Sequence, residues 1–147
     1  MLVPANFNAP GQIVLSGESA ACDRAVEVAS AVGLRASKLS VAGAFHSPIM
    51  APAAERLSAA LSTASINIPA CPVLSNVTGK PHDAQVVSIR ARLVDQLTRP
   101  VLWIDCCQWL AANARGEFHE TAPGRVLSGL MRRIDRNVKV TSHDEPG

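Results

Sequence analysis

The sequence lacks two features that would narrow its function at once, a strong charge of one sign and a long apolar run. Its 14 basic and 12 acidic side chains give a net charge of only +2, which argues against a nucleic-acid-binding surface. No apolar run reaches the roughly 20 residues that a helix needs to cross a bilayer, and the first residues, MLVPANFNAPG, lack the pattern of a secretory signal. We therefore expect a cytoplasmic protein that binds neither nucleic acid nor membrane.

Aromatic residues and paired metal ligands are also scarce. Aromatic residues make up 3% of the chain and tyrosine is absent, so the core has to be packed from small and aliphatic side chains. The cysteines show no C-x-x-C spacing and no H-x-x-x-H pair exists, which argues against a structural zinc site. We expect no bound metal, and we interpret the four cysteines as reduced, small apolar side chains buried in the core: Cys22, Cys71, Cys106 and Cys107.

The chain does contain an alternation of short strand patterns and amphipathic helix patterns. With 147 residues, 48% of them hydrophobic, it can bury a core of one domain's size. Strands are predicted at residues 3–7, 12–16, 39–41, 66–68, 73–74, 117–120 and 138–140. Helices are predicted between Gly17 and Gly33, from Pro48 or Pro52, from Asp83 to Pro100, over residues 103–114 and after Gly124. This alternation is typical of an α/β fold.

Four short segments resemble a known family. They read NFNAPGQ at residues 6–12, GAFHS at 43–47, RLVDQL at 92–97 with Pro100 and Trp103 following, and APGRVL at 122–127. In order and spacing they resemble the C-terminal half of the bacterial malonyl-CoA:acyl carrier protein transacylases, members of the acyltransferase family. The resemblance implies a partial ferredoxin-like subdomain at residues 1–42, the C-terminal part of an α/β-hydrolase-like acyltransferase core at 43–141, and a flexible tail at 142–147.

His46 is the residue that this resemblance marks as catalytic. A serine hydroxyl attacks a thioester well only when a base takes its proton, and a neutral imidazole can take that proton and return it to the departing thiolate. On position alone, a histidine with a purely structural role would be the favoured interpretation of His46, but the flanking GAFHS residues reverse this and favour the catalytic interpretation. The family orients this ring through a backbone carbonyl, and the matching position here is Gln96.

The same resemblance implies four substrate-binding residues. In related acyltransferase domains, a phenylalanine directly before the histidine accompanies malonyl selection, because its bulk crowds an α-methyl group; Phe45 has this position, with a core aromatic as the alternative. Asn8, Gln12 and Asn76 match the polar lining of the family's substrate cleft. For Asn8 and Asn76 a second interpretation stays open, since both lie near predicted turns, where asparagine serves backbone geometry.

The sequence lacks the other half of such a site. The family nucleophile lies in a G-x-S-x-G turn, and this pattern does not occur; Ser19, in SGESA, has only the first glycine of the pattern. The oxyanion donors and the arginine that pairs with the malonate carboxylate in the family are missing as well. We expect the chain to be inactive alone, either as a truncated product or as one part of an assembly whose other chain supplies the serine.

The residues leave three functions open. The leading one is an acyl-carrier-protein S-malonyltransferase of fatty acid biosynthesis, with malonyl-CoA as substrate, acyl carrier protein as partner and no bound cofactor. The alternatives are a non-catalytic module that binds the carrier protein and a fragment of a polyketide-synthase acyltransferase domain. A small metal-binding protein is disfavoured by the spacing of the cysteines and histidines.

Overall fold

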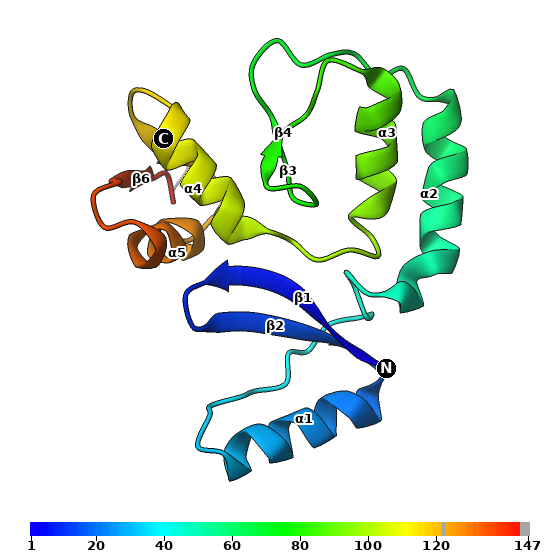
Figure 1. Ribbon diagram of the computed structural model, residues 1–147, viewed down its shortest axis with the longest axis vertical. Helices are drawn as coiled ribbons and strands as arrows, with labels where there is room; N and C mark the ends of the chain where they lie inside the picture. The colour runs from blue at the N-terminus through cyan, green and yellow to red at the C-terminus, as the bar shows by residue number, and fades with distance from the viewer. Residues whose placement is uncertain (122, 145–147) are drawn as a thin grey trace.

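The computed structural model describes residues 1–121 and 123–144 of the chain (Figure 1). Within these residues, three two-stranded sheets alternate with helices, which confirms the α/β class. Among the described residues, no helix combines the length and the apolar character that a bilayer-spanning helix requires. In chain order the elements are β1 (Leu2–Ala9), β2 (Gln12–Gly17), α1 (Ser19–Ala31), η1 (Pro48–Met50), α2 (Ala51–Thr63), β3 (Leu74–Ser75), β4 (Lys80–Pro81), α3 (Val86–Asp95), α4 (Trp103–Asn113), β5 (Phe118–Glu120), α5 (Val126–Ile134) and β6 (Val140–Ser142).

The antiparallel hairpin of β1 and β2 lies at the centre of the molecule (Figure 1). Its turn contains Gly11, whose φ of +72° lies in the left-handed region that residues with a Cβ rarely adopt. β1 contacts α4 and α5, and β2 contacts α1. Ala5 and Ala9 of β1 are buried, so small side chains allow a close approach between the hairpin and its neighbours.

Helices α4 and α5 form the best-buried part of the structure. Cys106 and Cys107 of α4 are 2% and 1% exposed, and Leu130 and Met131 of α5 are also buried. Burial, followed by the neighbouring Cys106, raises the pKa of Cys107 to about 12, so its thiol stays protonated and packs as a small apolar group. The interpretation of the cysteines as core residues is thus confirmed for this pair, whereas it is wrong for Cys71, which is exposed.

Several predicted elements differ from the observed ones. Residues 39–41 and 66–68 are not strands, because neither segment has a hydrogen-bonded partner strand among the described residues. Asp83 does not cap a helix: α3 begins at Val86, and the Asp83 carboxylate instead accepts hydrogen bonds from Ser88 Oγ and Arg92 Nη2, both at 2.9 Å.

The end of the chain also differs from the prediction. The last strand, β6, pairs in parallel with β5 and includes Ser142, the first residue of the predicted tail. Residues 145–147 of that tail lie outside the described residues, as does Ala122 of the APGRVL segment.

Glu120 joins β5, β6 and α5 through its carboxylate. The residue is 4% exposed, and its oxygens accept hydrogen bonds from the backbone N–H groups of Leu127 (2.8 Å) and Ser128 (2.9 Å) and from Ser142 Oγ (3.0 Å). Burial alone would raise the pKa of Glu120, but these hydrogen bonds outweigh it and hold the pKa below its usual value. The carboxylate therefore serves as an N-terminal cap for α5 that is contributed from a neighbouring strand.

We predict that acid destabilises the protein through Glu120. Because its pKa is lowered in the folded state, the stabilisation is complete above the unfolded carboxyl pKa and is lost as the pH falls through the folded pKa. Glu120→Gln should lower the urea midpoint at neutral pH and reduce its dependence on acid below about pH 4. Glu117→Gln, at an exposed position three residues earlier, is the matched control. Equal acid dependence in Glu120→Gln and the wild type would contradict this role.

Candidate active site

The candidate site is centred on His46, in the loop that precedes η1. Its Nδ1 lies 2.6 Å from the backbone carbonyl oxygen of Gln96, at the C-terminal end of α3. A carbonyl oxygen can only accept, so Nδ1 carries a proton, and in the neutral ring Nε2 therefore presents its lone pair. A second bond, from the His46 backbone N–H to the Leu97 carbonyl (3.0 Å), fixes the main chain at the same place. The half-buried ring is therefore held with Nε2 ready to accept a proton.

The backbone of His46 is itself unusual. Its φ of +61° makes it the only non-glycine residue with positive φ among residues 1–121 and 123–144. This left-handed conformation costs an L-residue about 1–2 kcal/mol, and such strain is retained where the surroundings impose it. Here the two hydrogen bonds to Gln96 and Leu97 impose it.

Ser47 stabilises the histidine loop through two hydrogen bonds. It is fully buried, its Oγ donates to the Ala44 carbonyl (2.6 Å), and its own carbonyl accepts the Met50 N–H (3.0 Å) at the start of α2. The Ser47 hydroxyl binds the Ala44 carbonyl and not the imidazole, so it stabilises the conformation of the loop. Sequence reasoning did not single out Ser47, although a serine directly before Pro48 is a signal for a helix start.

Phe45, the residue expected to select malonyl, directly precedes the histidine and is 45% exposed. This exposure contradicts the alternative of a core aromatic. A Cβ built on Gly43 would meet the ring of Phe45 at 3.6 Å, so the ring folds back over the loop. A role in acyl selection stays a prediction.

The three predicted polar lining residues come from two other parts of the fold. Asn8 lies at an irregularity of β1, between Phe7 and Ala9. Gln12, at the start of β2, accepts a hydrogen bond from Arg133 of α5, whose other nitrogen donates to the Pro10 carbonyl (2.9 Å). Asn76 follows β3, in the turn toward β4. Among the described residues, no hydrogen bond links Asn8, Gln12 or Asn76 directly to His46.

A strip of backbone hydrogen bonds nevertheless connects these parts. Val101 pairs with β1, donating to Ala5 O (2.8 Å) and accepting from Phe7 N (2.9 Å), and Leu102 N donates to Asn76 O (2.8 Å). The same segment begins with Gln96 and Leu97, whose carbonyls hold His46. Residues 96–102 thus bring the histidine loop, the first hairpin and the Asn76 turn into one region.

Comparison with known proteins shows the family to which the chain belongs. The acyl transferase domain family matches residues 1–141, and the chain belongs to this family. It resembles the crystal structure of the malonyl-CoA:acyl carrier protein transacylase of Xanthomonas oryzae, with 42% identity and a TM-score of 0.92 over 99% of this chain and 46% of that one. It is also 38% identical to the malonyl CoA-acyl carrier protein transacylase of Escherichia coli over 144 residues, 97% of this chain and 46% of the relative.

A further similar structure is a malonyl-transacylase in complex with a type II polyketide-synthase acyl-carrier protein. It shares 35% identity and a TM-score of 0.93, over 99% of this chain and 47% of that one. The chain therefore spans about half the length of the relatives it matches, a share consistent with their C-terminal half. The family resemblance of the four sequence segments is confirmed.

The strain at His46 gives a prediction about stability. His46→Ala and His46→Gly both remove the ring and its bond to Gln96, but only glycine adopts a φ of +61° without a Cβ penalty. We expect His46→Gly to be more stable than His46→Ala by about 0.5–1 kcal/mol, measured by chemical denaturation. A more stable alanine variant would show that the loop relaxes once the ring is removed.

Proposed function

We propose that this chain carries the histidine part of a malonyl-CoA:acyl carrier protein transacylase. The observation that carries the proposal is the contact at His46, where Nδ1–H donates to Gln96 O at 2.6 Å and leaves Nε2 of the neutral ring as an acceptor. Membership of the acyltransferase family and the names of its relatives support the same reaction. These names favour an enzyme over a non-catalytic carrier-binding module.

In the proposed reaction, His46 acts as base and then as acid. Nε2 takes the proton of a serine hydroxyl while the serine oxygen attacks the thioester carbonyl of malonyl-CoA. The C–S bond then breaks, and the imidazolium returns its proton to the coenzyme A thiolate. In the second half-reaction the phosphopantetheine thiol of the carrier gives its proton to Nε2 and its sulfur attacks the malonyl-serine ester. The ester C–O bond then breaks, and the imidazolium returns the proton to the serine oxygen. The Gln96 carbonyl stabilises the imidazolium formed in both steps.

The nucleophilic serine belongs, in this proposal, to a polypeptide segment beyond the present chain. The sequence has no G-x-S-x-G turn. Ser47 donates its hydroxyl to Ala44 O, and Ser19, at the start of α1, accepts a hydrogen bond from Lys38 Nζ (3.0 Å). Neither serine shares a hydrogen bond with His46. The chain alone is therefore expected to transfer no malonyl groups.

Acyl carrier protein is the proposed partner of the complete site. A related malonyl-transacylase has been solved in complex with such a carrier. Phe45, Asn8, Gln12 and Asn76 remain the proposed substrate-binding residues, since residues 96–102 are hydrogen-bonded to the first hairpin, to the Asn76 turn and to the histidine loop that contains Phe45. Malonyl-CoA enters as substrate, and the proposed chemistry requires no bound cofactor.

Reconstitution tests this proposal. The segment that precedes the matched region in the Xanthomonas oryzae transacylase is mixed with this chain, malonyl-CoA and holo acyl carrier protein, and malonyl-carrier is measured. We expect transfer by the mixture and by neither part alone. His46→Ala should lower the rate by about 100-fold or more, whereas His119→Ala, which changes an exposed histidine on β5, should not. Transfer that survives His46→Ala, or that this chain performs alone, would refute the proposal.

A further inference from the structure

Two histidines lie side by side on the exposed face of β5 and β6. The strands run parallel, with His119 opposite Thr141. The ladder continues one residue beyond β6, where the backbone N–H of His143 donates to the Glu120 carbonyl (2.9 Å). Side chains alternate along a strand, and because Glu120 is buried against α5, His119 points to the opposite, exposed face. His119 Nδ1 lies 3.0 Å from His143 Nε2, with the ring centroids 5.1 Å apart.

The main chain beneath both rings is held by contacts on its other side. The carboxylate of Glu120, the residue that follows His119, caps α5. Asp144, the residue that follows His143, accepts a hydrogen bond from the Gly124 backbone N–H and lies 3.6 Å from Arg125 Nε. Both imidazoles are thus positioned before any ligand arrives, which lowers the entropic cost of binding one.

Glu117 determines which nitrogen of His119 carries the proton. Its Oε2 lies 3.4 Å from His119 Nε2, and a carboxylate favours a proton on the nitrogen that it faces. In the neutral ring Nδ1 then keeps its lone pair, on the side of His143. A carboxylate behind an imidazole is the arrangement that orients metal-ligating histidines in proteins. His119 therefore has the tautomer that a metal ligand needs.

The separation of the two facing nitrogens fits one shared metal ion. Zn²⁺ binds imidazole nitrogens at about 2.0–2.1 Å, so two nitrogens on one ion, at angles of about 90–109°, are roughly 2.9–3.3 Å apart. The 3.0 Å between His119 Nδ1 and His143 Nε2 lies within this range, and it serves equally for a hydrogen bond between the metal-free rings. Imidazole suits Zn²⁺, Ni²⁺ and Cu²⁺, whereas Mg²⁺ and Ca²⁺ prefer oxygen ligands. The ligand class is therefore a divalent transition-metal cation.

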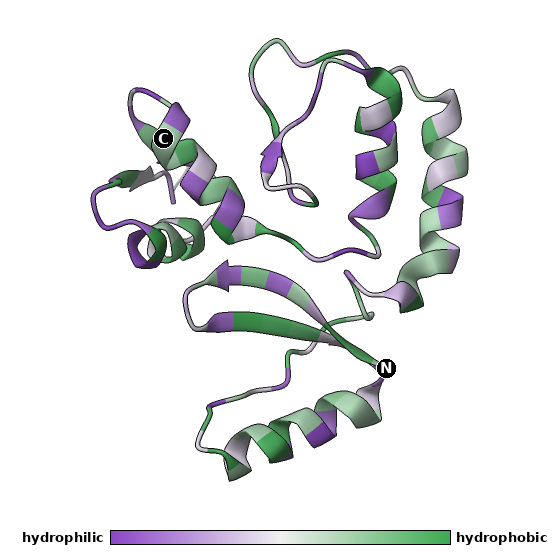
Figure 2. Cartoon of the chain, in the orientation of Figure 1, coloured by the Kyte–Doolittle hydropathy of each residue, from purple (hydrophilic) through white to green (hydrophobic). Residues whose placement is uncertain are grey.

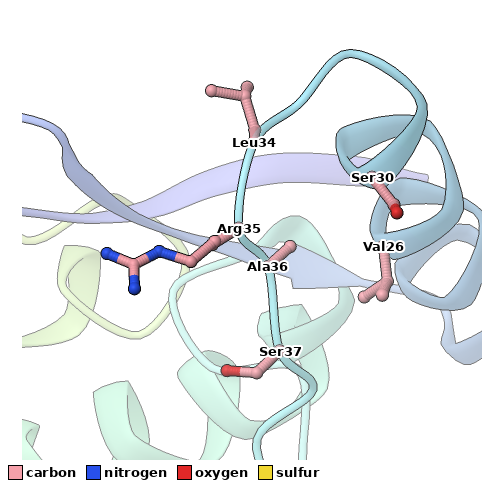
Figure 3. A pocket seen from close by; sticks show the side chains of 6 residues that line it. All are labelled: Val26, Ser30, Leu34, Arg35, Ala36 and Ser37. Carbon is pink, nitrogen blue, oxygen red and sulfur yellow. The ribbon is translucent and has the colours of Figure 1, made fainter.

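The surroundings leave this pair open to ions in solution. Figure 2 shows hydrophilic residues in the loops that lead into β5 and into β6. Among the described residues, no three His, Cys, Asp or Glu side chains are grouped to hold a metal ion, so water has to complete the coordination. The hollow beside α1 offers no competing metal ligand, because it is lined by Val26, Ser30, Leu34, Arg35, Ala36 and Ser37 (Figure 3).

We propose that His119 and His143 form a two-histidine chelate for a divalent transition-metal cation, with Glu117 as the orienting carboxylate. The ion joins β5 to the residue that follows β6, so its binding stabilises the folded chain. The expectation of no bound metal considered only local spacings, and these two histidines are 24 positions apart. The site lies on other elements than the His46 loop, and the proposed malonyl transfer uses no metal. The chelate therefore does not depend on the proposed function.

Thermal unfolding with added metal tests the chelate. The full chain is used without a histidine tag. Excess Zn²⁺ should raise the Tm by roughly 3 °C or more, and equal Mg²⁺ should leave it unchanged. His119→Ala and His143→Ala should each abolish the rise, whereas Thr141→Ala, on the same face of β6, should keep it. An equal rise in either histidine variant and the wild type would overturn the inference, as would the absence of a rise in the wild type.

Imidazole ¹⁵N–¹H spectra of the wild-type chain test the site without any variant, and so remain decisive if an alanine variant fails to fold. Zn²⁺ on both facing nitrogens requires the proton of His143 to move from Nε2 to Nδ1, while His119 keeps its proton on Nε2. The signals of His46 and His82 should not change. Zn²⁺-dependent changes confined to His46 or His82, or unchanged signals of His119 and His143, would overturn the inference.

The two proposals fail in different ways. Zn²⁺ binding at His119 and His143 without malonyl transfer in the reconstituted mixture would leave the chelate standing and count against the proposed function. Malonyl transfer by a mixture whose His119 and His143 do not respond to Zn²⁺ would do the reverse.

Discussion

The backbone of residues 96–102 is the constraint on which the rest of the site depends. At one end its carbonyls bind the ring and the main chain of His46. At the other end Val101 pairs with β1 and Leu102 binds the carbonyl of Asn76. The histidine loop, the first hairpin and the Asn76 turn, which are widely separated in sequence, are thus all bound by main-chain groups of residues 96–102. Substitutions of the side chains along this segment can leave these contacts intact, whereas a shift of its backbone would disturb all three.

The histidine loop shows how local strain and local support are balanced. The positive φ of His46 is unfavourable, yet it lets the backbone N–H donate to the Leu97 carbonyl and the ring Nδ1–H donate to the Gln96 carbonyl. Ser47, fully buried, joins the loop to η1, because its Oγ donates to Ala44 O and its carbonyl accepts from Met50 N. The chemical result is an imidazole in a defined tautomer, which is what a general base for a hydroxyl or a thiol requires.

Much of the secondary structure could be predicted because it depends on local patterns. The hairpin of β1 and β2 follows from alternating residues around a Pro-Gly turn, and α4 and α5 follow from their apolar periodicity. Predictions that needed a distant partner failed. Residues 39–41 have strand-forming side chains but no strand beside them, and Asp83 pairs with Arg92 instead of capping a helix.

The site could be predicted only in part, for a related reason. His46 and Gln96 were found through a short motif and a family resemblance, and their contact is present. The hydrogen bonds from the Arg133 side chain to Gln12 and to the Pro10 carbonyl join residues more than 100 positions apart. The Glu120 carboxylate can cap α5 only because β5 packs beside the start of that helix. No local pattern encodes such contacts, so they become visible only in the folded chain.

The tautomer of His46 is the most direct test of this account. Two-dimensional ¹⁵N–¹H correlation spectra of the imidazole, recorded on the full chain at a pH where the ring is neutral, distinguish a proton on Nδ1 from one on Nε2. The 2.6 Å contact with the Gln96 carbonyl predicts the Nδ1–H tautomer, with Nε2 unprotonated. A ring that is mainly in the Nε2–H form would contradict the account, because Nε2 would then have no lone pair with which to take a proton from a hydroxyl or a thiol.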